Sequence, residues 1–393
     1  MKKTIDDISV EGRQVLVRVD FNVPMNADQT IADDTRIRAC LPTIQNLTGR
    51  GARVILCSHL GRPKGRVVHD LSLAPAGKQL SVLLDQDVHQ APDCIGPAVQ
   101  DMVSRMTDGD VLLLENLRFH PEEEANDPVF SSQLALLAEI YVNDAFGASH
   151  RNHASVVGIT RFLPAVAGLL MQKELIMLGG LLENPTRPFA AIVGGAKVSS
   201  KIGVLENILN KTDLLIIGGG MAATFLAAKG YPVGTTPVER DRLSYIAELS
   251  RKATSKNVRI LLPKDLLVSE KADGTGKYRS VTIDSIQENE AIVDIGAATI
   301  AQYTAELKEC RTIVWNGPMG IFEVPAFSEG TRAIASTLAS LDAVTVVGGG
   351  STAEIVTEMG LSNRMSHVST GGGASLQFLA GEPLPGVNAL PDR

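Results

Sequence analysis

Short, mainly apolar segments recur along the chain, and helix-length segments separate most of them. They occupy residues 15–19, 54–57, 111–114, 140–142, 189–193, 214–217, 260–262, 292–295, 312–315 and 344–347. Apolar runs without polar alternation are typical of strands that are buried on both faces, as in parallel sheets. The pattern therefore predicts an α/β protein with two doubly wound, Rossmann-like parallel sheets, one in each half of the chain.

One apolar segment, residues 164–185, has the length of a helix rather than that of a strand. Within it, the polar residues Gln172, Lys173 and Glu174 interrupt an otherwise apolar sequence. A helix that is apolar on nearly every face has to be buried. We predict that it is a hinge helix between two domains. In this division, the helix is 169–184, the first domain is 1–168 with the tail 377–393, and the second is 185–376.

Length and composition agree with two domains of this class. A chain of 393 residues is too long for one ordinary core. Its hydrophobic content of 44% with only 4% aromatic residues suits cores built from Val, Ile, Leu and Ala. The four cysteines include no CxxC pair, which argues against a zinc site and against a disulfide framework.

The net charge bears on the binding partners of the protein, and its first residues bear on its location in the cell. The net charge of -7 argues against nucleic acid and anionic membranes as partners. The first residues, MKKTIDDISVEG, lack the apolar segment of a signal peptide, and no apolar run is long enough to span a membrane uninterrupted. We therefore expect a cytoplasmic protein. Because nothing in the sequence demands oligomerisation, we also expect a monomer.

In the first half, basic motifs follow the predicted strands. They read RVDFNVP (18–24), SHLGRPKG (58–65), LENLRFHPEEE (114–124) and SHRNHAS (149–155). Ligands of open parallel sheets bind beyond the carboxyl ends of the strands, so these motifs are expected to line one site. A small polyanion held by several charge-assisted hydrogen bonds would need this many donors.

Arg36 adds a further cation to this predicted site. Asp33, Asp34 and Thr35 can cap a helix that begins at Arg36, which leaves its guanidinium free as a planar fork for carboxylate or phosphate. Plainer interpretations exist, because RVDFNVP could close its strand with an Asx-type turn and a lone histidine such as His59 is more often structural. The repetition of basic strand ends favours the anion site.

In the second half, glycines and lysines take the place of the arginines. The segment GGAKVSSKIGVLENIL (194–209) places Lys197 and Lys201 four residues apart on one face at the start of an amphipathic helix. Such a helix start suits a nucleotide phosphate, although a pair of surface lysines is the alternative and the segment is no Walker P-loop. In GGGSTAEIV (348–356), Ser351 and Glu354 have the spacing of a capping box, and the bare amides suit a terminal phosphate.

Two glycine segments, 218–223 and 348–353, also match the loose dinucleotide fingerprint GxGxxA. Neither is followed by a convincing ribose-binding acid at the end of the next strand. A nicotinamide-dependent dehydrogenase therefore remains one alternative. A hinged small-molecule binding protein is a second alternative, against which the missing export signal weighs.

Taken together, the segments resemble the phosphoglycerate kinase family over essentially the whole chain. VLVRVDFNVP, SHLGRP, LLLENLRF, VNDAFG, HRNHAS, GGAKVSSK, VWNGPMGIFE and TGGGASL stand in the order in which that family has them. The resemblance implies a glycolytic phosphotransferase with a carboxyl group as acceptor. Such an enzyme reversibly transfers the acyl phosphate of 1,3-bisphosphoglycerate to Mg²⁺-bound ADP, giving 3-phosphoglycerate and ATP.

The resemblance also implies roles for individual residues. Those that would bind the three-carbon acid are Asp20, Asn22, Arg36, His59, Arg62, Arg118 and Arg151. Those that would contact the nucleotide are Gly195, Ala196, Lys201, Gly219, Gly296, Asn316, Pro318, Glu323, Gly348, Gly349, Gly350, Ser351 and Thr352. The moving phosphoryl group would be surrounded by Arg36, Lys197, Lys201, Gly349 and Gly350.

One departure from the family bears on the metal. Where much of the family has an aspartate after the glycine triplet, this chain has Ser351. A hydroxyl is a weaker Mg²⁺ ligand than a carboxylate, so the ion would rely on Ser351 or only on phosphate oxygens and water. Gln377 likewise replaces a common glutamate.

We expect an in-line transfer in which the protein supplies no nucleophile. Catalysis would then come from positioning and from cations aimed at the transferred group. Because water would hydrolyse an acyl phosphate, the reaction should wait for a domain closure, with hinges in the 169–184 helix and at residues 371–373.

Overall fold

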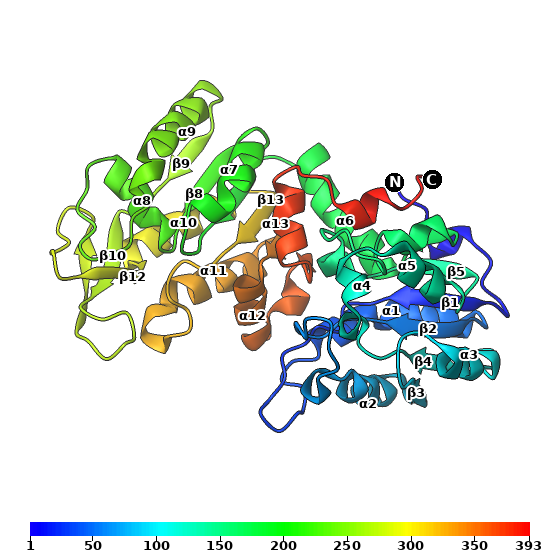
Figure 1. Cartoon of the computed structure of the whole chain (residues 1–393). Helices are drawn as coiled ribbons and strands as arrows, with labels where there is room; N and C mark the ends of the chain where they lie inside the picture. Colours follow the sequence, from blue (N-terminus) through cyan, green and yellow to red (C-terminus); the bar gives the residue numbers. More distant parts are fainter. The chain divides into compact units, whose positions relative to one another are not determined.

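The structure, a computed structural model, describes residues 1–393 and divides into two compact units (Figure 1). Unit 1 comprises Met1–Ile176 and Pro383–Arg393, and unit 2 comprises Met177–Glu382. The chain passes from unit 1 into unit 2 within helix α6 (Leu169–Glu183) and returns between Glu382 and Pro383.

Unit 1 contains a six-stranded parallel sheet with the strand order β3-β4-β2-β1-β5-β6. The strands are β1 (Gln14–Arg18), β2 (Arg53–Cys57), β3 (Val88–Gln90), β4 (Val111–Leu113), β5 (Ile140–Asn143) and β6 (Ala165–Ala167). The longer helices between them are α1 (Thr35–Gly49), α2 (Ala74–Leu84), α3 (Pro97–Ser104) and α5 (Pro128–Ala135). The prediction of a doubly wound parallel sheet is confirmed.

Burial explains which strands the apolar pattern revealed. In β1 and β2, only the first residue is partly exposed, and β4 and β5 are buried throughout. These strands lie inside the sheet, where both faces are covered by helices, so each reads as an apolar run. Strand β3 is an edge strand of three residues, none of them fully buried, and its sequence VHQ carries no apolar run.

The apolar segment 164–185 contains a short strand ahead of the predicted helix 169–184, which corresponds to α6. Its first residues form β6, which pairs with Tyr141–Asn143 of β5, and α6 begins only at Leu169. The buried Asp144 accepts hydrogen bonds from the backbone N–H groups of Leu170 (2.9 Å) and Met171 (3.2 Å), so it supplies acceptors at the helix start. This cap comes from the loop after β5, and no pattern local to the helix could reveal it.

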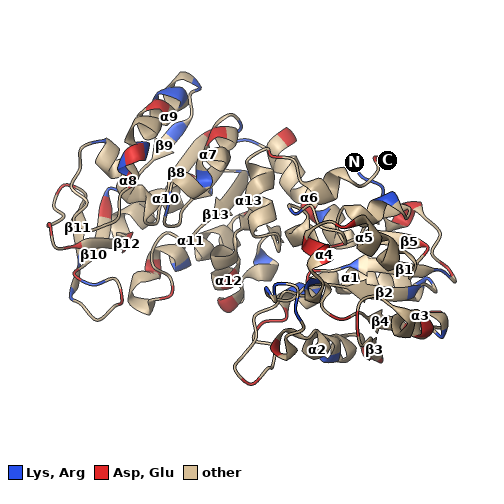
Figure 2. Ribbon diagram, viewed as in Figure 1, with Lys and Arg blue, Asp and Glu red and all other residues tan.

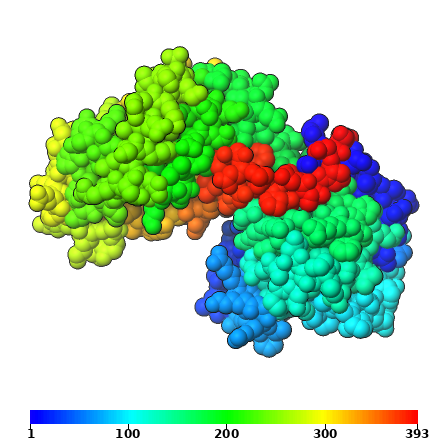
Figure 3. Space-filling view, turned by 45° about the horizontal axis from the view of Figure 1, so that its top comes forward, coloured from blue at the N-terminus to red at the C-terminus, as the bar shows by residue number.

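The C-terminal residues of unit 1 pack against its N-terminal part. Gly386 donates its N–H to the carbonyl of Ser149 (2.8 Å), and its own carbonyl accepts from Nδ2 of Asn143 (3.2 Å). A bridge between Lys2 and Asp392 places the two ends of the chain next to each other, as Figure 3 shows in blue and red. Part of this tail is a short helix, α14 (Pro385–Asn388).

Unit 2 contains a second six-stranded parallel sheet, with the order β15-β14-β13-β7-β8-β9. The strands are β7 (Phe189–Val193), β8 (Leu214–Ile217), β9 (Arg259–Leu261), β13 (Thr312–Asn316), β14 (Val344–Gly348) and β15 (His367–Val368). The helices are α7 (Ile202–Leu209), α8 (Met221–Ala228), α9 (Leu243–Ser255), α10 (Ala297–Lys308), α11 (Glu329–Ser340), α12 (Gly350–Glu358) and α13 (Gly373–Leu379). The second predicted parallel sheet is therefore also present.

The predicted strand at 292–295 has different partners from those expected. It is β12 (Ala291–Ile295) of a separate three-stranded antiparallel sheet with β10 (Asp265–Ser269) and β11 (Tyr278–Thr282). An apolar run indicates burial, but it does not say which strand lies beside it. The expectation that this run joins the parallel sheet is wrong.

Candidate functional site

In each unit the direction of winding reverses beside the first strand of the parallel sheet. Strand β1 lies between β2 and β5, and β7 lies between β8 and β13. At such a position, the loops that follow two neighbouring strands run to opposite faces of the sheet. A crevice therefore forms between them at the carboxyl ends of the strands. The polar residues that follow β1, β2 and β5 in unit 1, and β7, β8 and β13 in unit 2, are therefore the ones to examine.

At this edge of unit 1, Asp20 is buried and paired with Arg36. Oδ2 of Asp20 accepts from Nη1 of Arg36 at 2.8 Å, and the arginine side chain keeps one third of its surface exposed. Asn22 accepts from the backbone N–H of Gly61 (2.8 Å). These contacts join the loops after β1 and β2 to the first turn of α1.

The imidazole of His59 lies between two guanidinium groups. Its Nδ1 is 3.1 Å from Nη2 of Arg18, and its Nε2 is 3.1 Å from Nη1 of Arg151. Burial of the ring, followed by the positive charges of Arg18 and Arg118, holds the pKa of His59 well below its usual value. A neutral imidazole has one donor and one acceptor nitrogen, so only one of the two contacts is a hydrogen bond. In the other contact, an N–H of the imidazole faces an N–H of a guanidinium, and the two donors repel each other. An anion bound there would accept from these donors and remove the repulsion.

A further arginine, Arg118, is close enough to His59 to lower its pKa, and it shares a partly buried environment with Arg151. Arg118 is 5% exposed and donates to the carbonyl of Gly61 (2.7 Å), and burial lowers its pKa to about 10. Burial also lowers the pKa of Arg151. Arg62 is exposed. Figure 2 shows blue segments gathered in the loops of unit 1 beside α1. The guanidiniums of Arg118 and Arg151 thus form a partly desolvated cluster that favours an anion.

Sequence reasoning missed the residues that support this cluster from below. Arg18 is 1% exposed and donates through Nε to Oγ of Ser155 (2.9 Å). Ser155 in turn donates through Oγ to the fully buried carboxylate of Glu123 (2.6 Å), which also accepts the Ser155 N–H (2.8 Å). The one signal in the sequence was the position of Arg18 inside the apolar run 15–19, because an arginine buried with such a strand needs partners.

In unit 2, three loops approach one another backbone to backbone. Gly194 donates to the carbonyl of Asn316 (3.0 Å), Gly195 to that of Pro318 (3.0 Å), and Gly219 to that of Met319 (2.9 Å). Gly219 has a φ of +64°, and a Cβ there would lie 2.5 Å from the nitrogen of Gly195. The glycines after β7 and β8 are therefore required for this close approach to the loop after β13.

Lys201 and Asn316 form a buried polar pair beneath these glycines. The ammonium of Lys201 donates to the backbone carbonyl of Asn316 (3.1 Å) and to its side-chain oxygen. Burial lowers the pKa of Lys201 to about 8. Nδ2 of Asn316 is buried with no partner, and it lies 3.2 Å from where a Cβ of Gly349 would be. These donors suit an anionic ligand.

Two local predictions in unit 2 are wrong. Lys197 and Lys201 do not share a helix face, because a 3₁₀ turn (Ser199–Lys201) precedes α7 and Lys197 lies exposed before it. The capping box of Ser351 and Glu354 is absent, because α12 begins already at Gly350 and its N-cap is Gly349. With a φ of +91°, Gly349 provides the turn that a serine N-cap would not adopt readily.

The remaining predicted nucleotide residues lie on nearby elements of unit 2. Thr352 is buried and its hydroxyl accepts the N–H of Gly317 (2.8 Å), whereas Ser351 is half-buried. Gly348 ends β14, and Gly296 is the N-cap of α10, after β12. The remaining two are exposed: Ala196, next to Gly195, and Glu323, in the loop after β13.

Comparisons with known proteins agree with one another. A family model described as phosphoglycerate kinase matches residues 5–382. The chain belongs to this family. A phosphoglycerate kinase of Pelotomaculum thermopropionicum is 54% identical over the full length of both chains, and that of Moorella thermoacetica is 52% identical, again over both full lengths. The solved phosphoglycerate kinase structure from Coxiella burnetii is 39% identical, covers 99% of this chain and 98% of its own, and has a TM-score of 0.88.

Family membership decides between the enzyme classes that the sequence left open. The chain is a kinase, a phosphotransferase whose acceptor is a carboxyl group, and nothing in the comparisons supports a nicotinamide-dependent dehydrogenase. No helix of the structure has the length and apolar character needed to cross a membrane.

His153 gives a test of the basic cluster through the pH dependence of stability. Burial, followed by Arg118 and Arg151, lowers its pKa to about 4. The unfolded chain therefore takes up a proton near pH 6.5 that the folded chain refuses, and stability is lost as the pH falls below that value. Between about pH 7.5 and about pH 5.5, His153→Gln should reduce the loss of unfolding free energy by on the order of 1 kcal/mol.

Urea unfolding followed by circular dichroism at the two pH values measures this difference. His69→Gln, at an exposed position, is the matched control and should lose as much stability as the wild type. An equal pH dependence in the His153 variant and the wild type would contradict the assignment of a neutral, desolvated His153.

Proposed function

We propose that this chain catalyses the reversible transfer of the acyl phosphate of 1,3-bisphosphoglycerate to ADP, giving 3-phosphoglycerate and ATP. The observation that carries the proposal is His59 between the guanidiniums of Arg18 and Arg151, with Arg118 also near enough to depress its pKa. A phosphorylated three-carbon acid supplies the negative charge that this cluster lacks. We place its distal phosphate against Arg62, Arg118 and Arg151.

In this proposal, each polar group of the loop after β1 has a defined task. Asp20 holds Arg36 at 2.8 Å, so that the guanidinium points towards the reacting carboxyl group. Asp20 and Asn22 accept hydrogen bonds from substrate hydroxyls, and the neutral His59 contributes one ring N–H without adding a charge.

The nucleotide binds the glycine loops of unit 2. The close approach of Gly194, Gly195 and Gly219 to the loop after β13 leaves a surface of backbone without side chains, which suits contact with adenosine diphosphate. Its phosphates lie against the start of α12, at Gly349 and Gly350, with Lys197 and Lys201 as cations. Glu323 accepts from the ribose hydroxyls.

Ser351 would lie beside Mg²⁺ bound together with the nucleotide, and the ion would supply positive charge that neutralises the phosphates. Near the start of α12 the chain offers the hydroxyl of Ser351 and backbone N–H groups, and N–H groups do not ligate cations. This donor set fits an ion that keeps phosphate oxygens and water as its main ligands, with Ser351 at most as an additional one.

The chemistry is an in-line displacement in which the attacking oxygen belongs to ADP or, in the reverse direction, to the carboxylate. Arg36, Lys197, Lys201 and the amides of Gly349 and Gly350 stabilise the charge on the transferred group. The domain closure expected from the sequence stays a prediction. We further propose that the chain acts as a cytoplasmic monomer.

A coupled assay tests the reaction itself. The purified chain with ADP, Mg²⁺ and 1,3-bisphosphoglycerate should form ATP, and acetyl phosphate should not replace the three-carbon substrate. Absence of ATP formation in a folded sample would refute the proposal.

Arg36→Lys tests the planar fork proposed at the reacting carboxyl group. A lysine keeps the charge but presents it as a point, so two parallel hydrogen bonds are lost. We expect kcat to fall about 100-fold and KM for 3-phosphoglycerate to rise by less. Arg38→Lys is the control, because Arg38 lies on the same helix but is exposed and paired with Asp34 at 2.8 Å. An unchanged kcat would remove Arg36 from the mechanism.

Lys201 predicts a specific pH profile. Since its pKa is lowered to about 8, the free enzyme loses this charge as the pH rises through that value. In the direction of ATP consumption, kcat/KM for ATP should fall towards a tenfold loss per pH unit above about pH 8. Lys201→Arg should abolish this fall, whereas Lys256→Arg at an exposed position should keep it. Equal profiles for Lys201→Arg and the wild type would exclude Lys201 as the titrating group.

Ser351→Asp tests the metal ligand. A carboxylate at this position should lower the Mg²⁺ concentration for half-maximal activity by about tenfold, because carboxylates are the preferred protein ligands of this ion. Ser351→Asn has similar size without the charge and should behave like the wild type. If Asp and Asn variants respond alike, residue 351 does not contact the ion.

A further inference from the structure

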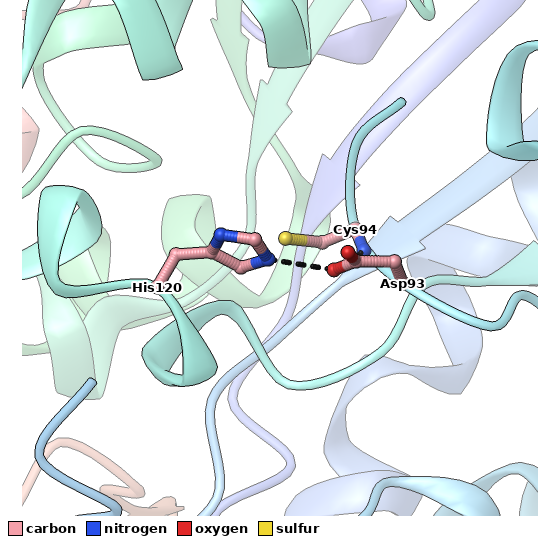
Figure 4. A group of neighbouring side chains, drawn as sticks. All are labelled: Asp93, Cys94 and His120. Carbon is pink, nitrogen blue, oxygen red and sulfur yellow. Dashed lines mark hydrogen bonds and ion pairs between the residues drawn. The ribbon is translucent and has the colours of Figure 1, made fainter. Parts of the chain in front are cut away.

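Asp93, Cys94 and His120 form a cluster of three metal-ligating side chains that has no part in the proposed reaction. The ligand atoms of the three residues all lie within 4.8 Å of one another. Figure 4 shows the imidazole of His120 pointing towards the carboxylate of Asp93, with the sulfur of Cys94 beside both. All three belong to unit 1.

The sheet brings these residues together from two separate segments. Asp93 and Cys94 lie in the loop between β3 and α3, and His120 follows the 3₁₀ turn Leu117–Phe119 beyond β4. Strands β3 and β4 are parallel neighbours, with Gln90 beside Leu113, so both segments leave the same edge of the sheet. The arrangement therefore rests on strand pairing rather than on sequence spacing.

The cluster is open to solvent on one side. Cys94 is completely buried, whereas the side chains of Asp93 and His120 keep 46% and 26% of their surfaces exposed. A cation could thus approach from the side of the oxygen and nitrogen atoms, reach the sulfur behind them, and retain a water molecule on its outer side.

We propose that Asp93, Cys94 and His120 bind a divalent transition-metal ion, Zn²⁺ in the first place, at a site separate from the reaction centre. One thiolate, one imidazole and one carboxylate are a donor set typical of Zn²⁺, with water as the fourth ligand. Tetrahedral bonds of about 2.0–2.3 Å place ligand atoms roughly 3.3–3.7 Å apart. Because all ligand atoms lie within 4.8 Å of one another, no pair has to approach by more than about 1.5 Å, and the Nε2–Oδ1 pair, at 2.7 Å, has to separate slightly.

On binding, the thiol of Cys94 releases its proton to solvent, and sulfur becomes a thiolate ligand. The proton that Nε2 of His120 donates to Asp93 moves through solvent to Nδ1, so that Nε2 is free to bind the ion. Burial, followed by the negative charge of Asp93, raises the pKa of this thiol, so the proton is present until a cation displaces it. The absence of a CxxC pair had argued against zinc, but these three ligands come from positions 93, 94 and 120 and do not need that spacing.

The competing explanation is a hydrogen-bonded cluster without an ion. Nε2 of His120 lies 2.7 Å from Oδ1 of Asp93, and the same oxygen accepts the backbone N–H of Cys94 at 2.7 Å. These bonds would position the two loops without a metal. The two explanations differ in one observable, which is a bond between the metal and sulfur.

Cobalt titration of the chelator-treated full chain, free of any tag and in excess Mg²⁺, reports that bond directly. We expect the wild type to bind one Co²⁺ with a thiolate-to-cobalt charge-transfer band in the near ultraviolet, and Zn²⁺ to displace it. Zn²⁺ in large excess over its Kd should raise the melting temperature by roughly 5 °C. The excess of Mg²⁺ keeps the nucleotide site from contributing.

Two variants and a control identify the ligands. Cys94→Ser should abolish the band, and His120→Gln should weaken Co²⁺ binding by roughly a hundredfold or more. Cys310→Ser, a buried cysteine of unit 2, should keep both the band and the affinity. The absence of a band in the wild type, or its persistence in Cys94→Ser, would overturn the proposal, and the first result holds even if a variant fails to fold.

Discussion

Unit 1 has to hold several guanidinium groups close to one buried imidazole. Like charges out of water repel strongly, so such a cluster is stable only where fixed acceptors surround it. Asp20 and Glu123 supply the negative charge, the latter through Ser155, and the carbonyl of Gly61 accepts from Arg118. In the proposed reaction, an anionic substrate balances the positive charge that remains. The repulsion among the guanidinium groups at the site is thus offset by hydrogen bonds to acceptors in the surrounding loops of unit 1.

Unit 2 presents mainly backbone groups at the carboxyl ends of its strands. Where unit 1 uses long basic side chains, unit 2 packs glycines against the loop after β13, and one buried ammonium, that of Lys201, lies below them. Backbone dipoles need no counter-charge when the ligand is absent, so this surface carries little repulsion of its own. The difference suits a small, highly charged acid in one unit and a larger ligand with an uncharged base in the other.

The same edge of the unit 1 sheet carries the cluster of Asp93, Cys94 and His120. His120 lies two residues after Arg118, and both follow β4. Parallel strands send all their carboxyl-terminal loops to one side, so residues with unrelated tasks gather there. The spacing of cysteines in the sequence does not predict a metal site at such an edge, because the order of the strands in the sheet determines which residues lie beside Cys94.

The recurrence of apolar runs in the sequence determined the fold class and the two parallel sheets, and the order of the motifs determined the family. Buried parallel strands must be apolar throughout, and a catalytic segment keeps its residue types in a fixed order. Tertiary structure alone decided the partners of β12 and the strand at Ala165–Ala167, since these depend on neighbours distant in the chain. It also decided that Lys197 is exposed while Lys201 is buried, and that Arg18 supports His59 from below. Local sequence specifies which groups are present, whereas burial and pairing in three dimensions set their charge and direction.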